Sequence, residues 1–396
     1  MKRQSSMNKK PDKVVIVTNI PSPYRTFLYD TLQDAFEAIG IGFCVHYLSV
    51  TEHDRHWHFD GAKVRHSHRF EPGFHLNSSM YRHINLGAPF RLARLKNTLV
   101  IVGGYDNFAT LILTLLPRHA SVVRMLWTES NHYSEARKGG IASAIKRHAI
   151  GSYHGYLVPG AWARDFVITH CPASAARPFV SMPNTIDEES FLAAVSPVDS
   201  TQERIAAGIS KDDVMVFVSA RLELFKNVLF TVKSLPDEFW QRCVLCVAGT
   251  GSEKKMLAQY ARERGIESRL ILLGQIPAER MPACYLMADL FLLPSLQDPS
   301  PLSCVEAMTC GLPLALSSHI GNHPEVLETG VNGFLFDPNS RAEISAVGSK
   351  IAALSRDELK RMGERSRVIA LERFATRHLV SATVERILAI YAAKTA

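Results

Sequence analysis

The sequence of 396 residues has no long hydrophobic run. No stretch approaches the ~18–20 consecutive apolar residues that a membrane-spanning helix needs. Residues 1–12 are polar and basic and lead into no apolar segment, so we expect a flexible N-terminus there and no secretory signal. The seven cysteines are an odd number scattered along the chain, which excludes a disulfide framework. These absences favour a cytoplasmic protein, with attachment to the inner membrane surface left open.

Nucleotide-binding and metal-binding patterns are absent or incomplete. There is no P-loop, and Gly249-Thr250-Gly251 lacks the full G-x-G-x-x-G pattern. The Cys243-x-x-Cys246 pair lies in an apolar run without a second ligand pair, which predicts a buried strand rather than zinc or redox chemistry. The His-rich segment 53–83 contains no cysteine and no ligand spacing that we recognise, so we interpret it as a solvated or acceptor-facing loop. We therefore predict no metal site.

The positive charge is concentrated in the first half of the chain. Residues 1–190 have 22 Lys and Arg against 15 Asp and Glu, whereas residues 191–396 have 23 of each. A basic half is compatible with an anionic membrane surface, an anionic acceptor or nucleic acid. Nucleic acid is disfavoured because no surface of alternating aromatic and basic residues is evident. Six basic residues are candidates for contact with a membrane or a lipid diphosphate: Arg65, Arg69, Arg82, Arg91, Arg94 and Lys96. The alternative is that the charge only confers solubility.

The sequence does contain a regular alternation of apolar, strand-like segments with helix-like segments. Two series of strands are predicted: Val14–Val17, Ile41–Leu48, Val100–Val102, Ser121–Trp127 and Gly155–Val158, then Val214–Ser219, Val244–Ala248, Leu270–Leu273, Leu290–Leu293 and Leu314–Leu316. This alternation predicts an α/β fold of two facing, doubly wound Rossmann-like domains, 13–190 and 191–375. Open sheets of this kind bind ligands at the carboxyl ends of their strands, so we expect the site in an interdomain cleft.

Charged residues gather after predicted strands of the second domain. Arg221 and Lys226 follow one strand, and two cations at such a position can bracket a diphosphate. Asp298 precedes, and Glu306 lies on, a helix that begins near Pro301, and a helix start offers free amide groups to a phosphate. Taken singly, each of these features has an ordinary alternative, such as an exposed basic pair or a solvated glutamate.

Together, however, these motifs occur in a distinctive order. They are Ala220-Arg221-Leu-x-x-x-Lys226-Asn227, Val247-Ala-Gly249-x-Gly251, Asp298-x7-Glu306-Ala-Met-x-x-Gly311-Leu-Pro, Pro324-Glu-Val and Gly330-x-Asn-Gly333-Phe-Leu. They resemble the C-terminal domain of retaining glycosyltransferases with the GT-B architecture, family 4 (group 1) in particular. The resemblance is strong over residues 212–340 and looser at residues 18–25 and 183–187.

The resemblance implies a nucleoside-diphosphate sugar, UDP- or GDP-linked, as co-substrate and no other cofactor. Arg221 and Lys226 would hold the diphosphate and stabilise the charge of the leaving group. Glu306 would bind the ribose and Asp298 the donor sugar. Further donor contacts are implied for Gly249, Gln275, Ile276, Leu302 and Ser303. The family usually has Glu where this chain has Asp298.

The N-terminal domain is expected to bind the acceptor. Glu129 and His132, just after a strand, are candidates for a residue facing the reacting sugar. The acceptor-side candidates follow the first strand and are Asn19, Ser22, Tyr24 and Arg25. The helix at 376–396 is expected to pack back on this domain.

The sequence thus predicts a retaining, metal-independent glycosyltransferase that acts on a glycan or lipid-linked acceptor in surface polysaccharide or glycoconjugate synthesis. Two alternatives remain at this point. One is a sugar-nucleotide epimerase on the same architecture, and the other is a non-catalytic subunit that binds glycan or membrane.

Overall fold

The computed structural model describes residues 9–51, 61, 64–76, 82–133, 140–193 and 200–396. Contacts divide the chain into two compact units. The first unit is Met1–Pro183 with Thr376–Ala396, and the second is Asn184–Ala375. The division falls slightly before the expected boundary at 190, because the side chain of Asn184 donates to the Ser300 carbonyl and Ile186 packs in the core of the second unit.

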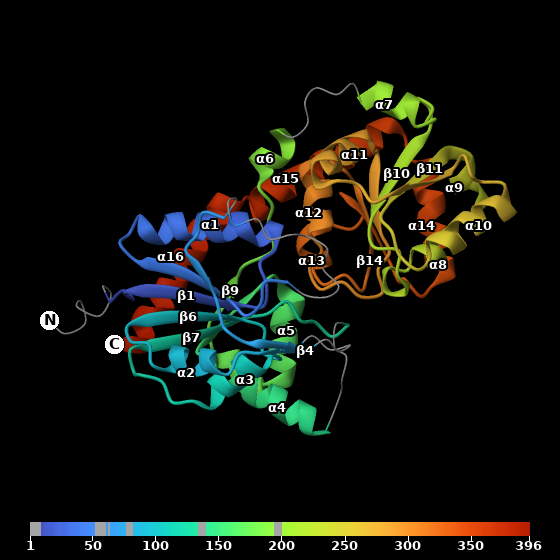
Figure 1. The fold of residues 1–396 in the computed structure, drawn as a ribbon. Coiled ribbons are helices and arrows are strands. Elements are labelled where there is room, and N and C mark those ends of the chain that lie inside the picture. Colours follow the sequence, from blue (N-terminus) through green and yellow to red (C-terminus); the bar gives the residue numbers. More distant parts are fainter. Residues whose placement is uncertain (1–8, 52–60, 62–63, 77–81, 134–139, 194–199) are drawn as a thin grey trace. The chain divides into compact units, whose positions relative to one another are not determined.

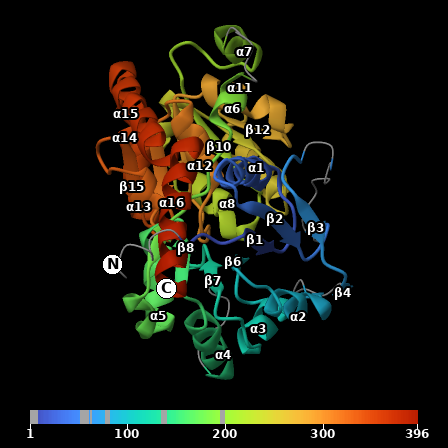
Figure 2. The ribbon, with the colours of Figure 1, turned by 90° about the vertical axis from the view of Figure 1, so that its left-hand side faces the viewer.

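The described residues of the first unit form a parallel sheet of seven strands in the order β3-β2-β1-β6-β7-β8-β9 (Figures 1 and 2). The strands are β1 (Lys13–Thr18), β2 (Gly42–Tyr47), β3 (His68–Phe70), β6 (Thr98–Gly103), β7 (Val122–Trp127), β8 (Gly155–Val158) and β9 (Phe179–Ser181). A separate hairpin joins β4 (Phe74–Leu76) to β5 (Arg82–Ile84). The central strands β1, β6, β7 and β8 are mainly apolar because helices cover both faces of the sheet.

The helices of the first unit are divided between the two faces. One face packs against α1 (Pro23–Glu37) and α16 (Thr376–Thr395), which contact each other. The other face packs against α2 (Gly87–Ala93), α3 (Phe108–Leu115), α4 (Gly140–Gly151) and α5 (Ala161–His170). The chain therefore returns to the first sheet at its end, and Tyr391 on α16 donates a hydrogen bond to the Ser121 carbonyl at 2.9 Å.

The second unit repeats the same winding. Its described strands are parallel and in the order β12-β11-β10-β13-β14-β15. They are β10 (Val214–Ser219), β11 (Cys243–Ala248), β12 (Leu270–Gly274), β13 (Leu290–Leu293), β14 (Leu314–Ser317) and β15 (Gly333–Phe336). The helices are α6 (Glu188–Ala193), α7 (Ser200–Ala206), α8 (Val228–Val232), α9 (Asp237–Arg242), α10 (Lys254–Arg264), α11 (Met281–Met287), α12 (Leu302–Thr309), α13 (His323–Val326), α14 (Arg341–Ala353) and α15 (Arg356–Phe374).

The strand orders show where the chain stops adding strands on one side of the first strand and continues on its other side. In the first unit the chain runs from β1 to β2 and then resumes on the other side of β1 with β6. In the second unit the same change occurs between β10 and β13. Ligands of doubly wound sheets bind at such switch points, outside the carboxyl ends of the strands. The predicted α/β class with two Rossmann-like sheets is confirmed.

The predicted burial of the cysteine pair is also confirmed. Cys243 and Cys246 lie in the fully buried strand β11. Burial raises the pKa of both thiols to about 12, so both carry a proton at neutral pH and serve as apolar packing groups.

Candidate active site

The two predicted cations lie in the loop that follows β10. This loop ends in a short 3₁₀ turn, Leu224–Lys226, and the chain then enters α8 through Asn227 in the left-handed conformation. The Phe225 ring lies under both cations, 5.1 Å from the Arg221 guanidinium carbon and 5.5 Å from Lys226 Nζ. A cation over an aromatic face is attracted to the ring's electron density. The loop therefore holds two positive charges on one ring at the switch point of the sheet.

Contacts with the loop after β13 join the two sides of this switch point. Lys226 Nζ and Asp298 Oδ2 form an ion pair at 2.5 Å, with both side chains about 15% exposed (15% and 14%). The backbone reinforces the pair, since the Leu296 N–H donates to the Phe225 carbonyl at 2.8 Å. The structure thus brings Asp298 to Arg221 and Lys226, from which it is more than 70 residues distant in the sequence.

Glu306 lies on α12, the largely buried helix that follows the loop of Asp298. From Cys304 to Thr309 every residue of α12 is buried, and Glu306 is 7% exposed. The Tyr285 hydroxyl donates to Glu306 Oε2 at 2.7 Å, although burial raises the pKa of this carboxyl. Burial raises the pKa of the neighbouring Cys304 thiol, and the charges of Asp298, Lys226 and Glu306 also act on it.

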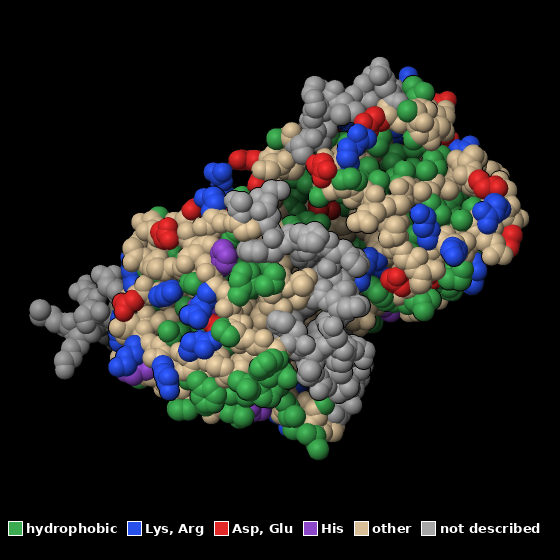
Figure 3. Space-filling view, in the orientation of Figure 1, with side chains coloured by type: hydrophobic (Ala, Val, Ile, Leu, Met, Phe, Trp, Pro, Cys, Tyr) green, Lys and Arg blue, Asp and Glu red, His purple; other side chains and the backbone are tan. Residues whose placement is uncertain are grey.

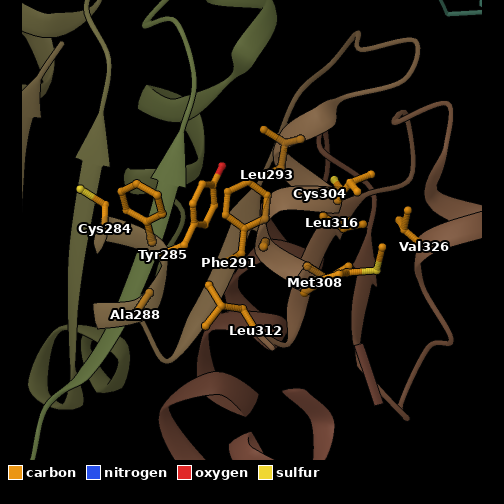
Figure 4. Packing of buried hydrophobic residues seen from close by; sticks show 14 of the residues in the cluster. Cys284, Tyr285, Ala288, Phe291, Leu293, Cys304, Met308, Leu312, Leu316 and Val326 are labelled. Atoms are coloured by element: carbon orange, nitrogen blue, oxygen red, sulfur yellow. The ribbon is translucent and has the colours of Figure 1, made fainter. Parts of the chain in front are cut away.

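Tyr285 is the site residue that sequence reasoning missed. It comes from α11 and is fully buried, with its ring 5.0 Å from Phe217 and 5.7 Å from Phe291. Figure 4 shows the rings of Tyr285 and Phe291 side by side in this core. Its apolar neighbours fix the ring, so the hydroxyl has a defined direction toward Glu306. No local pattern marks this tyrosine, because its partner lies on a different helix.

The start of α12 offers amide groups to a ligand. Pro301 is the N-cap and supplies no capping side chain, so Leu302 and Ser303 begin the helix without a side-chain acceptor for their first-turn amides. The carbonyls around the helix start are already used, since Ser300 accepts from Asn184 and Pro301 from Asn322. The backbone at this helix start is therefore fixed with its N–H groups left for an anion.

The glycine-rich turn after β11 has a packing role. A Cβ on Gly249 would lie 1.9 Å from the Ala220 carbonyl oxygen, and one on Gly251 would lie 2.4 Å from that of Leu222. Both glycines have a positive φ, 145° and 157°. The predicted tight turn is therefore what allows the loop bearing Arg221 to lie against the next strand end. Gln275 is exposed and Ile276 packs on the core, both directly after β12.

In the first unit, Arg25 on α1 connects two groups of predicted residues. Its guanidinium forms an ion pair with Glu129 and lies 4.3 Å from the Trp127 ring centroid. Burial lowers the pKa of Arg25, but its interactions with the Tyr29 side chain and the Glu129 carboxylate outweigh this and raise it. Arg25, which follows β1, and Glu129, which follows β7, are thus in contact, because the two strands end at the same edge of the sheet.

The remaining candidates of the first unit have other neighbours. The side chain of Asn107 donates to Asn19 at 3.3 Å, while Ser22 is the N-cap of α1 and Tyr24 is exposed. His132 is exposed, and its ring lies 5.9 Å from that of Phe166.

The His-rich segment 53–83 lies partly outside the described residues, which omit 52–60, 62–63 and 77–81. In the described part His66 is buried and bonds Asp30 at 2.6 Å and the Tyr47 hydroxyl at 2.9 Å. His46 contacts Glu71 at 2.9 Å. These histidines have protein partners within the core. Among the described residues, no group of three or more His, Cys, Asp or Glu side chains is arranged to hold a metal ion.

Several of the basic candidates for a membrane or acceptor contact are already paired. Arg65 pairs with Asp34, and Arg69 and Arg91 both pair with Glu71. Arg94 and Lys96 are exposed and have no ion pair among the described residues. The excess charge of the first half is therefore partly internal to the fold. None of the helices in the described ranges is long and apolar enough to cross a membrane.

The part of the chain that contains this site is similar to a known family. Residues 199–368 match the family model described as Glycosyl transferases group 1. The chain is 28% identical over 200 residues to an N-acetyl-alpha-D-glucosaminyl L-malate synthase of Bacillus anthracis, covering 50% of each chain. It is 28% identical over 163 residues to a UDP-Gal:alpha-D-GlcNAc-diphosphoundecaprenol alpha-1,3-galactosyltransferase of Escherichia coli, covering 40% of this chain and 41% of that one.

These matches span about half or less of the length of the curated relatives. Over nearly the whole chain the fold is similar to a crystal structure of Anabaena HepE in complex with UDP. The TM-score is 0.70 at 16% identity, covering 95% of this chain and 99% of that chain. The fold is thus similar to that of the GT-B glycosyltransferases, and residues 199–368 are similar to the glycosyl transferases group 1 family.

Proposed function

We propose that this protein transfers a sugar from a nucleoside-diphosphate donor to the hydroxyl of a glycan or lipid-linked acceptor. The observation that carries the proposal is the ion pair of Lys226 with Asp298 at the switch point between β10 and β13, with Arg221 over the same Phe225 ring. Glu306 lies buried on α12, the helix that follows the loop of Asp298. Two cations and free helix amides suit a diphosphate, and a carboxylate suits a ribose. The relatives support the donor class, since neighbouring structures contain UDP and UDP-glucose.

We assign the diphosphate to Arg221, Lys226 and the amides of Leu302 and Ser303. As the bond between the anomeric carbon and the diphosphate breaks, its electron pair moves to the leaving oxygen. The two cations stabilise this growing charge more than the charge of the bound donor, which lowers the barrier. In this assignment Lys226 exchanges Asp298 for the diphosphate, and Asp298 is then free to accept from a hydroxyl of the donor sugar.

The proposed reaction retains the anomeric configuration and needs no metal ion. The acceptor hydroxyl attacks the anomeric carbon on the face that the leaving group departs from, and its proton passes to the departing phosphate oxygen. The cations take the place that a metal ion would have beside the diphosphate. The E. coli relative, whose name states a diphosphoundecaprenol acceptor, supports a lipid-linked acceptor at a membrane surface.

The test is donor turnover by the full chain with a panel of UDP- and GDP-sugars and lipid-diphosphate glycan acceptors. We expect one donor to be consumed only when an acceptor is present, with an α-linked product from an α-linked donor by NMR. Lys226→Ala should abolish transfer, whereas Lys255→Ala on the exposed side of α10 should not. Donor conversion to an epimer without acceptor, or no nucleotide binding at all, would refute the proposal.

A further inference from the structure

An acidic residue that the proposed function does not use lies in the loop of the two cations. Glu223 stands between Arg221 and Lys226 in the sequence. On the face of the second unit that Figure 3 shows, Lys and Arg side chains lie among Asp and Glu side chains. A carboxylate so close to the cations can compete with an anionic ligand for them. The direction of the Glu223 side chain therefore matters for the donor site.

Both oxygens of the Glu223 carboxylate accept hydrogen bonds from one residue of the neighbouring turn. Ser252, just after the glycine-rich turn that follows β11, donates its N–H to Oε1 at 3.1 Å and its hydroxyl to Oε2 at 2.7 Å. These hydrogen bonds lower the pKa of Glu223, and the charge of Arg221 lowers it further. Glu223 is therefore ionised at neutral pH and turned toward Ser252, although Arg221 lies within electrostatic range.

The backbones of the two loops are joined without this side-chain contact. Three backbone hydrogen bonds connect the loop after β10 with the turn after β11. They run from the Ala220 N–H to the Ala248 carbonyl at 3.0 Å, from the Leu222 N–H to the Thr250 carbonyl at 2.9 Å and from the Glu253 N–H to the Leu222 carbonyl at 2.9 Å. What the hydrogen bonds from Ser252 add is a fixed direction for a charged side chain that would otherwise rotate among several conformers.

We propose that Ser252 is a positioning residue of the donor site, which holds the Glu223 carboxylate on the turn after β11 and away from the diphosphate. The inference rests on the proposed function, in which Arg221 and Lys226 bind that diphosphate. If the Glu223 side chain rotated away from Ser252, its charge could pair with the Arg221 guanidinium and repel the ligand. Ser252 would thus act on the ligand only through the place that it gives to a neighbouring negative charge.

The test is calorimetry of the full chain with UDP and GDP, and with uridine and guanosine as uncharged probes. Ser252→Ala removes the hydroxyl that holds Oε2 of Glu223. We expect the Kd of the nucleoside diphosphate to rise about two- to fivefold, which is the range of an exposed ion pair. The rise should shrink as salt is added, because exposed charges are screened. Binding of the nucleoside should not change, because it carries no diphosphate.

Removal of the charge itself separates this role from a structural one. Glu223→Gln should bind the nucleoside diphosphate at least as tightly as the unsubstituted chain, and Ser252→Ala should have no further effect in the Glu223→Gln background. Ser252→Thr keeps the hydroxyl and should keep the affinity. A contact that served only to stabilise the loop would instead make Glu223→Gln weaken binding as Ser252→Ala does, and the double variant would show no rescue.

The matched control is the same kind of contact at the other edge of the same sheet. Ser355 donates its N–H and its hydroxyl to the Glu358 carboxylate at 2.9 and 2.6 Å, at the start of α15. The adjacent Arg356 pairs with Asp289, which precedes β13, so this contact lies at the amino edge of the strands. Ser355→Ala should lower the free energy of unfolding, since it removes a helix cap, without changing the affinity for UDP or GDP.

The unsubstituted chain and the variants test different statements. If the unsubstituted chain binds neither UDP nor GDP, the proposed function is refuted, and the inference about Ser252 is refuted with it. If the unsubstituted chain binds a nucleoside diphosphate and Ser252→Ala binds it equally tightly, only the inference about Ser252 is overturned. The same holds if Glu223→Gln weakens binding to the same extent as Ser252→Ala.

Discussion

The substitution Glu306→Gln separates what the buried carboxylate does for folding from what it is proposed to do for the donor. Burial raises the pKa of Glu306 above its ordinary 4.5, and the hydrogen bond from Tyr285 offsets this only in part. Below the unfolded-state pKa both states are protonated, and the group has no effect on stability. As the pH rises from the unfolded-state pKa toward the raised folded-state pKa, the unfolded state ionises first, so the folded state loses relative stability, and this penalty is present at neutral pH. Gln should therefore raise the free energy of unfolding at pH 7 more than at pH 4.

Glu306→Gln should weaken donor binding although it stabilises the fold. Tyr285 occupies Oε2, so Oε1 is the oxygen left for a ribose hydroxyl. A hydrogen bond to an ionised group is worth about 1.5–3 kcal/mol and one to a neutral amide about 0.5–1.5 kcal/mol. The expected loss is therefore about 1–2 kcal/mol, which corresponds to a Kd about 5- to 30-fold higher. A variant that is more stable yet binds the nucleotide more weakly is the signature of a carboxylate kept for ligand binding.

The assay combines urea unfolding from pH 4 to 8 with calorimetry against UDP and GDP. Glu253→Gln is the matched control, since Glu253 is a second buried glutamate of the same unit whose pKa burial raises. It should gain stability in the same pH range without any change in nucleotide affinity. An unchanged Kd for both nucleotides in Glu306→Gln would refute the assignment of Glu306 to the ribose.

Three further substitutions test other parts of the structure. Lys226→Ala should weaken nucleoside-diphosphate binding at least tenfold and leave binding of the nucleoside alone unchanged by calorimetry, with Lys255→Ala unaffected. Gly249→Ala should cost ~3 kcal/mol in urea unfolding because its Cβ would meet a carbonyl oxygen at 1.9 Å, against ~1 kcal/mol for Gly265→Ala, which has space around it. The pKa of Glu71 is lowered to about 2, because hydrogen bonds from a histidine and an arginine outweigh burial. The ionised Glu71 stabilises the folded state above about pH 4.5, and this stabilisation is lost as the pH falls toward 2. Between these pH values the free energy of unfolding should fall by about 3 kcal/mol less in Glu71→Gln than in the unsubstituted chain, as measured by urea unfolding.

The fold could be predicted because most strands of both sheets are continuous apolar runs. Strands that are buried on both faces, such as β10 and β11, need no alternation of polar and apolar residues, and their length separates them from helices. The edge strands β9 and β15 were not predicted. They have only three and four residues, some of them half-buried, and β15 begins with the glycine of a turn motif.

The sequence predicted the site residues whose positions follow from the order of the strands. It did not predict those whose role depends on side-chain contacts. Arg221 and Asp298 each follow a strand, and the topology alone brings those strand ends together. The ring of Phe225 beneath both cations and the hydroxyl of Tyr285 on Glu306 depend on side-chain directions that no spacing records. Such contacts became visible only in three dimensions.

The helix α3 shows why hydrophobic pattern alone misplaces a surface. Its sequence Phe-Ala-Thr-Leu-Ile-Leu-Thr-Leu has no charged residue, and a helix that is apolar all round is ordinarily a core helix. In the structure Ala109 and Leu113 are buried, but Leu115 is 70% exposed. The pattern of residue types cannot separate the buried Leu113 from the exposed Leu115 two residues on, because both are leucine and only the position of the sheet decides which one packs against it.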